Sequence, residues 1–368
     1  MVDFLSDQSF FAYVIMGFWL FSLILIFYIL TFLYRKHRQS INYPRWNYIA
    51  DTFIRNAIFY HSEDPRSSNS EEDAPLIVSP VTERLNKLLK IPRFRRMISR
   101  KLSLAMDNMS GSARVNLKNV FFQLRLNEHV PEMLNSKAWH IQALGIQLVG
   151  VMNMRKHTGS MLRFTSHARG LIRMEAQNTL IRLMGFQGLK FLDNAKYPIS
   201  EWQQIKILEE LTDTPFDDVS GFKRWLSSEN HTVVILALKL VRLYYQFGFY
   251  DEAAANLTHH HPEVRRQAIM CITALQSDPT ILQLIERYPL EDEKIKITIL
   301  DCLSKIATEE EIPFLISLID DAGTNLLIAV SKTLAALGEK GLRALKAHPK
   351  AQQYPLQNII VQIESEKP

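Results

Sequence analysis

Residues 264–275 read Val-Arg-Arg-Gln-Ala-Ile-Met-Cys-Ile-Thr-Ala-Leu and carry apolar side chains at positions 1, 5, 9 and 12 of the stretch. This spacing places the four side chains on one face of a buried helix. Residues 172–183, which read Ile-Arg-Met-Glu-Ala-Gln-Asn-Thr-Leu-Ile-Arg-Leu, repeat the pattern 92 residues earlier. A second copy at a fixed distance predicts that the chain is built from internal repeats.

The repeat has a period of about 31 residues. One helix position recurs with steps of 31, 30, 31, 31 and 30 residues, and weaker copies at Ala143 and Ile359 extend the series at both ends. The six clear copies are Ala176, Ile207, Ala237, Ala268, Ile299 and Ala329. A second apolar stretch follows after a short polar turn, and a pair of such short helices cannot bury a core alone. The sequence therefore predicts an all-α fold, an αα-superhelix of stacked helix pairs.

Helix starts are marked within this series. Pro262 stands at a first-turn position after the polar triplet 259–261, and Thr308 with Glu311 has the spacing of a capping box. The run from His261 to Ala268 resembles the second helix of a HEAT repeat, in which Pro, a spacer and Val-Arg precede Ala and Leu. The resemblance covers roughly residues 110–365. The short period is similar to that of phycobilin-lyase-like HEAT repeats and of membrane-anchored bacterial HEAT-repeat proteins.

Two other repeat families fit less well. Residues 248–253 resemble one turn of a tetratricopeptide helix, but the marks of that family do not recur at its spacing of 34 residues. The Thr-Pro-Leu-His turn of ankyrin repeats is not found in the sequence. A HEAT-like solenoid is the favoured fold, and another αα solenoid is the alternative.

The amino-terminal segment predicts a transmembrane helix over residues 10–34. No charged residue occurs from Gln8 to Tyr34, and the segment is long enough to cross a hydrocarbon core of about 30 Å. A secretory signal peptide would begin with basic residues and end at a small-residue cleavage site, whereas this chain begins with Asp3 and Asp7. The basic flank follows the span and consists of Arg35, Lys36 and Arg38. By the positive-inside rule, the remainder of the chain is expected to be cytoplasmic. The resemblance to membrane-anchored bacterial HEAT-repeat proteins implies that the membrane is the inner (cytoplasmic) membrane.

Composition divides the chain into six segments. We expect a short external terminus (1–9), the transmembrane helix (10–34), a basic and amphipathic juxtamembrane segment (35–60), a flexible acidic Ser/Pro linker (61–80), a basic helical region (81–135) and the HEAT-like solenoid (136–368). The juxtamembrane segment carries Trp46, Ile49, Phe53 and Ala57 at helical spacing from Pro44 onward. This pattern predicts a short amphipathic helix that rests on the membrane or on the first repeat.

Charge is concentrated in one block. Residues 84–174 contain seventeen Lys and Arg against three Asp and Glu, a net charge of +14, although the whole chain carries only +5. The densest part, which alternates with apolar residues, consists of Arg84, Lys87, Lys90, Arg93, Arg95, Arg96, Arg100 and Lys101. These residues are candidates for binding anionic lipid headgroups or an acidic protein partner. A solvated helix face and a nucleic-acid-binding surface are the alternatives, the latter the least favoured.

The sequence offers little catalytic or metal-binding chemistry. It lacks a phosphate-binding Gly loop, a Gly-x-Ser-x-Gly elbow and a His-Glu-x-x-His motif, so no catalytic, cofactor or metal residue is nominated. The triplet 259–261 is expected to form a turn with helix-capping residues, because no further ligand pattern completes a metal site. Cys271 and Cys302 are one repeat apart, so we expect them to pack as free thiols roughly 9–10 Å from each other.

These observations predict a membrane-anchored cytoplasmic scaffold or adaptor. The HEAT-like surface would bind protein partners, whose identity is open. The resemblance to membrane-anchored bacterial HEAT proteins implies a place in an envelope polysaccharide glycosyltransferase assembly. The alternative is a non-redox enzyme subunit, a lyase or transferase component similar to the phycobilin lyases. A deep cavity with converging polar groups would favour the enzyme, and an open groove the adaptor.

Overall fold

The structure, a computed structural model, describes residues 8–59, 82–212, 214 and 220–365. The predicted linker 61–80 and residues 1–7 of the external terminus lie outside these residues. The described part is helical throughout and contains no β-strand. The chain forms two compact units, residues 1–152 and residues 153–368.

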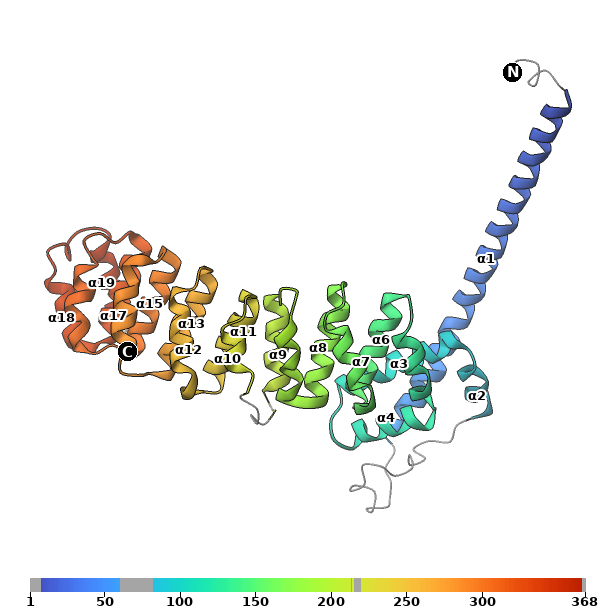
Figure 1. The fold of residues 1–368 in the computed structure, drawn as a ribbon, viewed down its shortest axis with the longest axis horizontal. Helices are drawn as coiled ribbons and strands as arrows, with labels where there is room; N and C mark the ends of the chain where they lie inside the picture. Colours follow the sequence, from blue (N-terminus) through green and yellow to red (C-terminus); the bar gives the residue numbers. More distant parts are fainter. Residues whose placement is uncertain (1–7, 60–81, 213, 215–219, 366–368) are drawn as a thin grey trace. The chain divides into compact units, whose positions relative to one another are not determined.

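The described residues of unit 1 form six α-helices (Figure 1). They are α1 (Gln8–Ile58), α2 (Glu83–Leu89), α3 (Pro92–Asp107), α4 (Gly111–Gln123), α5 (Val130–Leu134) and α6 (Trp139–Val151), with a 3₁₀ turn η3 (Leu126–His129) before α5. Helix α3 packs against α4 and α6, and α5 packs against α6. The largest fully buried side chains of this unit include Phe94 and Phe121.

Helix α1 is one continuous helix of 51 residues, in which Pro44 is an internal position. Its stretch from Tyr13 to Tyr34 is long and apolar enough to cross a membrane and is not covered by other parts of the protein. The sequence predicted a separate amphipathic helix from Pro44 onward, whereas the structure continues the first helix through this residue. Proline removes one backbone hydrogen bond but does not stop a helix that neighbouring packing supports. The side chains of the basic flank, Arg35, Lys36 and Arg38, are outside the described ones.

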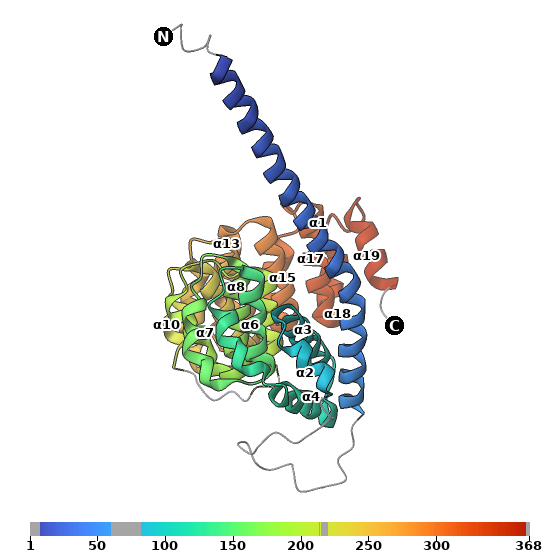
Figure 2. The same cartoon turned by 90° about the vertical axis from the view of Figure 1, so that its right-hand side faces the viewer.

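The carboxyl-terminal part of α1 packs on α3 and α4 (Figure 2). The buried side chains are Ala50, Phe53, Ile54 and Ala57. The ring of Trp46 meets Phe94 edge-on with the centroids 5.9 Å apart, and Lys101 Nζ lies 2.6 Å from Asp51 Oδ1. The expected amphipathic face therefore rests on the protein, through residues one position away from some of those predicted.

Unit 2 is a row of short helices that follow one another in chain order (Figure 1). They are α7 (Thr158–Phe164), α8 (Gly170–Met184), α9 (Glu201–Leu211), α10 (Phe222–Leu226), α11 (His231–Leu243), α12 (Tyr250–Ala255), α13 (Pro262–Leu275), α14 (Thr280–Arg287), α15 (Glu293–Ile306), α16 (Ile312–Ser317), α17 (Thr324–Ala336), α18 (Gly338–Ala347) and α19 (Leu356–Ser365). Single 3₁₀ turns join several of them, and the longest is η5 (Gly185–Asn194).

The repeat position predicted from sequence lies in one layer of unit 2. Helices α11, α13, α15, α17 and α19 pack side by side in this order, and α8 packs on α9. Helices α9 and α11 are joined by Lys239 Nζ, which donates to Gln204 Oε1 at 2.9 Å. All six clear copies of the repeat position are buried, with exposed fractions between 0% and 8%. The predicted all-α solenoid is confirmed, and its repeat position is buried in this layer of packed helices.

The second layer consists of shorter helices that cover the first. Helix α12 packs on α13, α16 on α17, and η5 on α8. Local signals start these helices as predicted: Pro262 is at the first turn of α13, and Thr308 and Glu311 form a capping box. Cys271 and Cys302 are buried free thiols, as expected.

Candidate functional site

The eight basic residues predicted as a binding set lie on α2, at the turn after it, and on α3. Arg84, Lys87, Lys90, Arg93 and Arg100 are exposed, whereas Arg95, Arg96 and Lys101 are half-buried. Several of them have partners within unit 1: Lys87 pairs with Glu83, Lys101 pairs with Asp51, and Arg95 Nη1 donates to the carbonyl of Leu89 at 3.3 Å. The set is therefore not one uniform surface, since part of its charge supports the local fold.

Two of these arginines line a small open pocket. The space is about 340 Å³, including its open mouth. Its lining consists of Pro92, Arg95, Arg96, His129, Glu132, Met133, Ser136 and Ile141. The residues contributed by α5 and by the turns on either side of it were not nominated from the sequence, because no motif links them to α3. His129 Nδ1 lies 3.8 Å from the carboxylate of Glu132.

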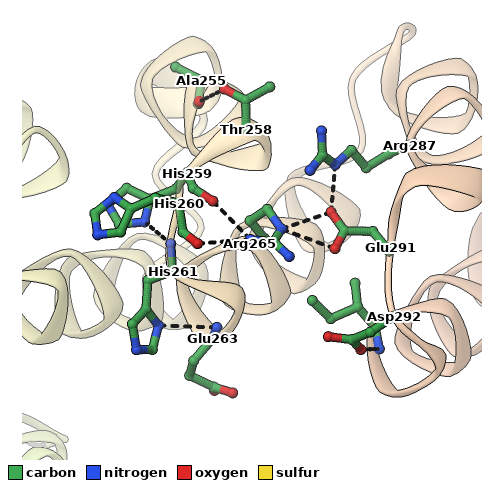
Figure 3. Close-up of polar contacts among 11 residues, drawn as sticks. Ala255, Thr258, His259, His260, His261, Glu263, Arg265, Arg287, Glu291 and Asp292 are labelled. Atoms are coloured by element: carbon green, nitrogen blue, oxygen red, sulfur yellow. Dashed lines mark hydrogen bonds and ion pairs between the residues drawn. The ribbon is translucent and has the colours of Figure 1, made fainter.

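A polar network joins successive repeats of unit 2 (Figure 3). Glu291 has a side chain with 0% exposure, and both of its carboxylate oxygens accept from Arg265 Nε at 2.9 and 3.0 Å. Arg287 Nε donates to the same carboxylate at 2.5 Å. Arg265 Nη1 also donates to the carbonyls of His259 and His260, at 3.0 and 3.2 Å. The Arg265 guanidinium thus connects the turn before α13 to Glu291, which lies just before α15 in the next repeat.

A similar interaction with the preceding turn is made by Arg173, at the repeat position equivalent to Arg265. Arg173 Nη1 donates to the carbonyls of His167 and Ala168, six and five residues before it, as Arg265 does with its own turn. Its guanidinium also lies 4.0 Å from the ring centroid of Tyr197. Lys296, at the third equivalent position, instead lies 5.4 Å from the ring of Tyr288. The basic residues at this position therefore tie turns and neighbouring repeats together.

The histidine triplet caps α13, as the sequence predicted. His261 Nδ1 accepts from the backbone N–H of Glu263, and His259 Nδ1 accepts from the N–H of His261. The ring of His261 stacks on His231 at 4.2 Å. Burial, and then the neighbouring imidazoles, lower the pKa of His259 and of His261. In the part of the chain that the structure describes, no three His, Cys, Asp or Glu side chains are arranged to hold a metal ion.

The tryptophans occupy two kinds of site. Trp225 is buried and donates from Nε1 to Asp193 Oδ1 at 2.7 Å, so it belongs to the core. Trp202 on α9 is 59% exposed, and Leu171 at the equivalent position of α8 is 52% exposed. Ile205, one turn after Trp202, is 42% exposed. These three side chains, here called the α8–α9 apolar ridge, are a candidate contact surface because large apolar groups are seldom left in water together.

Comparisons with known proteins support the repeat assignment. Residues 251–348 match the HEAT-repeat family. This range runs from α12 to α18, so the similarity to HEAT repeats lies within unit 2. No curated protein sequence gives a significant match.

Two solved structures match the chain at low identity and low TM-score. One is an engineered protein, with 12% identity and a TM-score of 0.38, where the match covers 76% of this chain and 86% of that one. The other is the complex of CpcE and CpcF of phycocyanin lyase from Nostoc sp. PCC7120, with 12% identity and a TM-score of 0.26, covering 82% of this chain and 99% of that one.

Proposed function

We propose that this protein is a membrane-anchored scaffold whose HEAT-repeat unit binds protein partners. The observation that carries the proposal is the combination, in one chain, of an uncovered apolar helix segment with a stack of HEAT repeats. Repeat stacks present extended surfaces to partners rather than a single enclosed site. We assign the chain no catalytic role.

The anchor is the segment Tyr13–Tyr34 of α1. Its side chains are uncovered, and in lipid they would be buried without any rearrangement of unit 1. The basic flank Arg35, Lys36 and Arg38 follows the span, which supports a cytoplasmic location for the chain after the span and insertion in the inner membrane.

The partner surface is proposed to include the α8–α9 apolar ridge. Trp202 supplies a large rigid side chain, and tryptophan is enriched among the residues that dominate binding energy at protein interfaces. Lys206 Nζ lies 5.1 Å from the centroid of the Trp202 ring and places a positive charge beside it. A membrane-bound glycosyltransferase assembly of the cell envelope is the partner class that we would test first.

Site-specific photo-cross-linking tests the partner surface. A benzophenone amino acid placed at Trp202 should give a discrete cross-linked band in membranes from the native host. The matched control is Leu282, which is 60% exposed on α14 in the other layer. Equal labelling at the two positions would mean that the ridge is not a specific contact surface.

The orientation can be tested separately. A reporter fused after Pro368 should be active in the cytoplasm, and the protein should remain in the membrane fraction after alkaline carbonate extraction. A carboxyl terminus that is active only outside the cytoplasm would contradict the proposed orientation, and release by carbonate would contradict the anchor.

A further inference from the structure

The first turn of α3 carries an unusual concentration of positive charge. Arg93 and Arg95 lie there, Arg96 follows directly, and the turn contains no acidic residue. The amino-terminal end of a helix is itself partly positive, so cations at this end are unfavourable for the helix. Residues that are unfavourable for the local structure are expected at functional sites. An open pocket lies beside this turn and is lined by two of the arginines.

The pocket brings Arg95 and Arg96 together with His129. Arg95 uses only Nη1 in its hydrogen bond to Leu89, so the rest of its guanidinium is available. Among the described residues, Arg96 makes no hydrogen bond or ion pair, although it is half-buried. Glu132 is the acidic residue of the lining, and its side chain is 70% exposed and turned to His129 at 3.8 Å. The lining therefore carries two guanidinium groups against one carboxylate.

We propose that this pocket binds the phosphate group of a small soluble phosphate ester. A guanidinium donates two parallel hydrogen bonds to phosphate oxygens, and such charge-assisted pairs are short and strong. The pocket is open, so a phosphate held at the arginines can carry a polar substituent that extends into solvent. The bound anion would also neutralise the arginines at the start of α3.

A phosphate can also come from a lipid headgroup, but the geometry of unit 1 favours the soluble source. This choice of source rests on the proposed membrane anchor. Helix α3 runs parallel to α1, because Phe94 meets Trp46 and, further along both helices, Lys101 meets Asp51. From Tyr34 to Trp46, α1 rises about 18 Å at 1.5 Å per residue. A tilt of about 40°, the upper end of the usual range, still leaves roughly 14 Å.

The headgroup layer extends only about 5–7 Å beyond the hydrocarbon core. At the level of Phe94, the first turn of α3 therefore lies beyond the layer in which a lipid phosphate is found. The arginines would interact with the charge of the membrane only through the intervening solution, in which electrostatic interactions are screened over a Debye length of about 8 Å. They would not bind a headgroup directly.

The test uses the full-length protein in nanodiscs of neutral phosphatidylcholine. Glycerol 3-phosphate and inorganic phosphate are titrated by calorimetry at constant ionic strength, with chloride as the competing anion. We expect saturable binding of glycerol 3-phosphate, and we expect Arg96→Gln to weaken it by at least about tenfold, since a hydrogen bond to a charged group is lost. Arg96→Lys, which keeps the charge but loses the planar fork, should give an intermediate affinity.

The matched control is Arg55→Gln, which removes the same charge from an exposed position of α1 in the same unit. Binding should stay within about twofold of the wild type, because the control leaves the pocket intact and long-range charge effects are screened. Far-ultraviolet circular dichroism and the melting temperature of each variant show whether Arg96→Gln remains folded. If it does not, the Arg96→Lys result decides the question.

Three results would overturn the proposal. Binding that is equal in Arg96→Gln and Arg55→Gln, or binding that chloride matches at the same ionic strength, would reduce the effect to general electrostatics. Nanodiscs with increasing anionic lipid that compete with glycerol 3-phosphate at constant ionic strength would assign the pocket to a headgroup instead. The membrane anchor is judged independently by carbonate extraction, so failure of the pocket and failure of the anchor are distinguishable.

Discussion

Replacing Glu291 by Gln should strongly disturb the packing between two helical repeats of unit 2, although glutamine has nearly the same shape as glutamate. The carboxylate has 0% exposure, and its two partners, Arg265 and Arg287, have side chains that are only 16% and 19% exposed. Removal of one member of a buried ion pair costs about 3–5 kcal/mol, because the remaining charge is left without compensation. Arg265 keeps its bonds to two carbonyls, so we expect the lower end, about 3 kcal/mol.

Hydrogen exchange followed by mass spectrometry is the suitable assay, because repeat proteins open locally and a single unfolding free energy does not describe them. A loss of about 3 kcal/mol corresponds to roughly 100-fold faster exchange of amides in α13 and α15. The control is Glu339→Gln, which breaks an ion pair with the same spacing of four residues, to Arg343. The side chains of that pair are 81% and 78% exposed. It should cost at most about 0.5 kcal/mol.

A double variant separates the loss of charge from the loss of shape. Arg287→Met combined with Glu291→Gln removes one of the two stranded guanidinium groups, so it should be less destabilised than the sum of the single changes, by about 1 kcal/mol or more. If Glu291→Gln and Glu339→Gln accelerate exchange equally, the buried carboxylate does not hold the two repeats together and the reasoning fails.

Three further predictions concern unit 2. Ala268→Leu should overpack the contact between helices and cost about 1–3 kcal/mol, whereas Lys332→Leu at an exposed position of α17 should change stability by at most about 0.5 kcal/mol. Equal changes in the hydrogen exchange of the two altered helices would mean that the repeat register is wrong. Because the pKa values of His259 and His261 are lowered in the folded state, the unfolded chain binds more protons, so stability should be complete above pH 6.5 and decline as the pH falls below it. Replacing both histidines by Asn, which caps without titrating, should flatten this decline, and an unchanged pH profile would contradict the assignment. Burial raises the pKa of Cys271 to about 12, so iodoacetamide should label it slowly at pH 7.5 until denaturant is added, and rapid labelling of the folded protein would contradict its packing.

The solenoid could be predicted from the sequence because the period of the repeat follows directly from how the helices pack. Every helix pair must bury a similar face against its neighbours, so the small or apolar residue at each contact recurs, and Ala176 and Ala268 mark the same place in the structure. The capping signals are also local, which is why Pro262 and the pair Thr308 and Glu311 could be identified without knowledge of the fold.

The polar contacts between repeats could not be predicted in the same way. Glu291 meets Arg265 across 26 residues, and its neighbours in sequence give no sign of burial. The pocket of unit 1 likewise joins the start of α3 to His129 and Glu132, which are brought together by the packing of helices and not by a motif. The eight basic residues were identified by their density, but density does not show that Lys101 is engaged with Asp51 while Arg96 faces open space.

Because α1 is continuous, it connects the candidate membrane span rigidly to the helices that pack on its carboxyl-terminal part. The helix has 51 residues and a length of about 76 Å, and the part after Tyr34 extends about 36 Å to Ile58, where it is clamped against unit 1. In the proposed arrangement, a change in bilayer thickness that alters the helix tilt by about 10° would move the clamped end by roughly 6 Å. Membrane thickness would then become a mechanical input to the position of α3 and α4, transmitted through Pro44, where one hydrogen bond within the helix is missing.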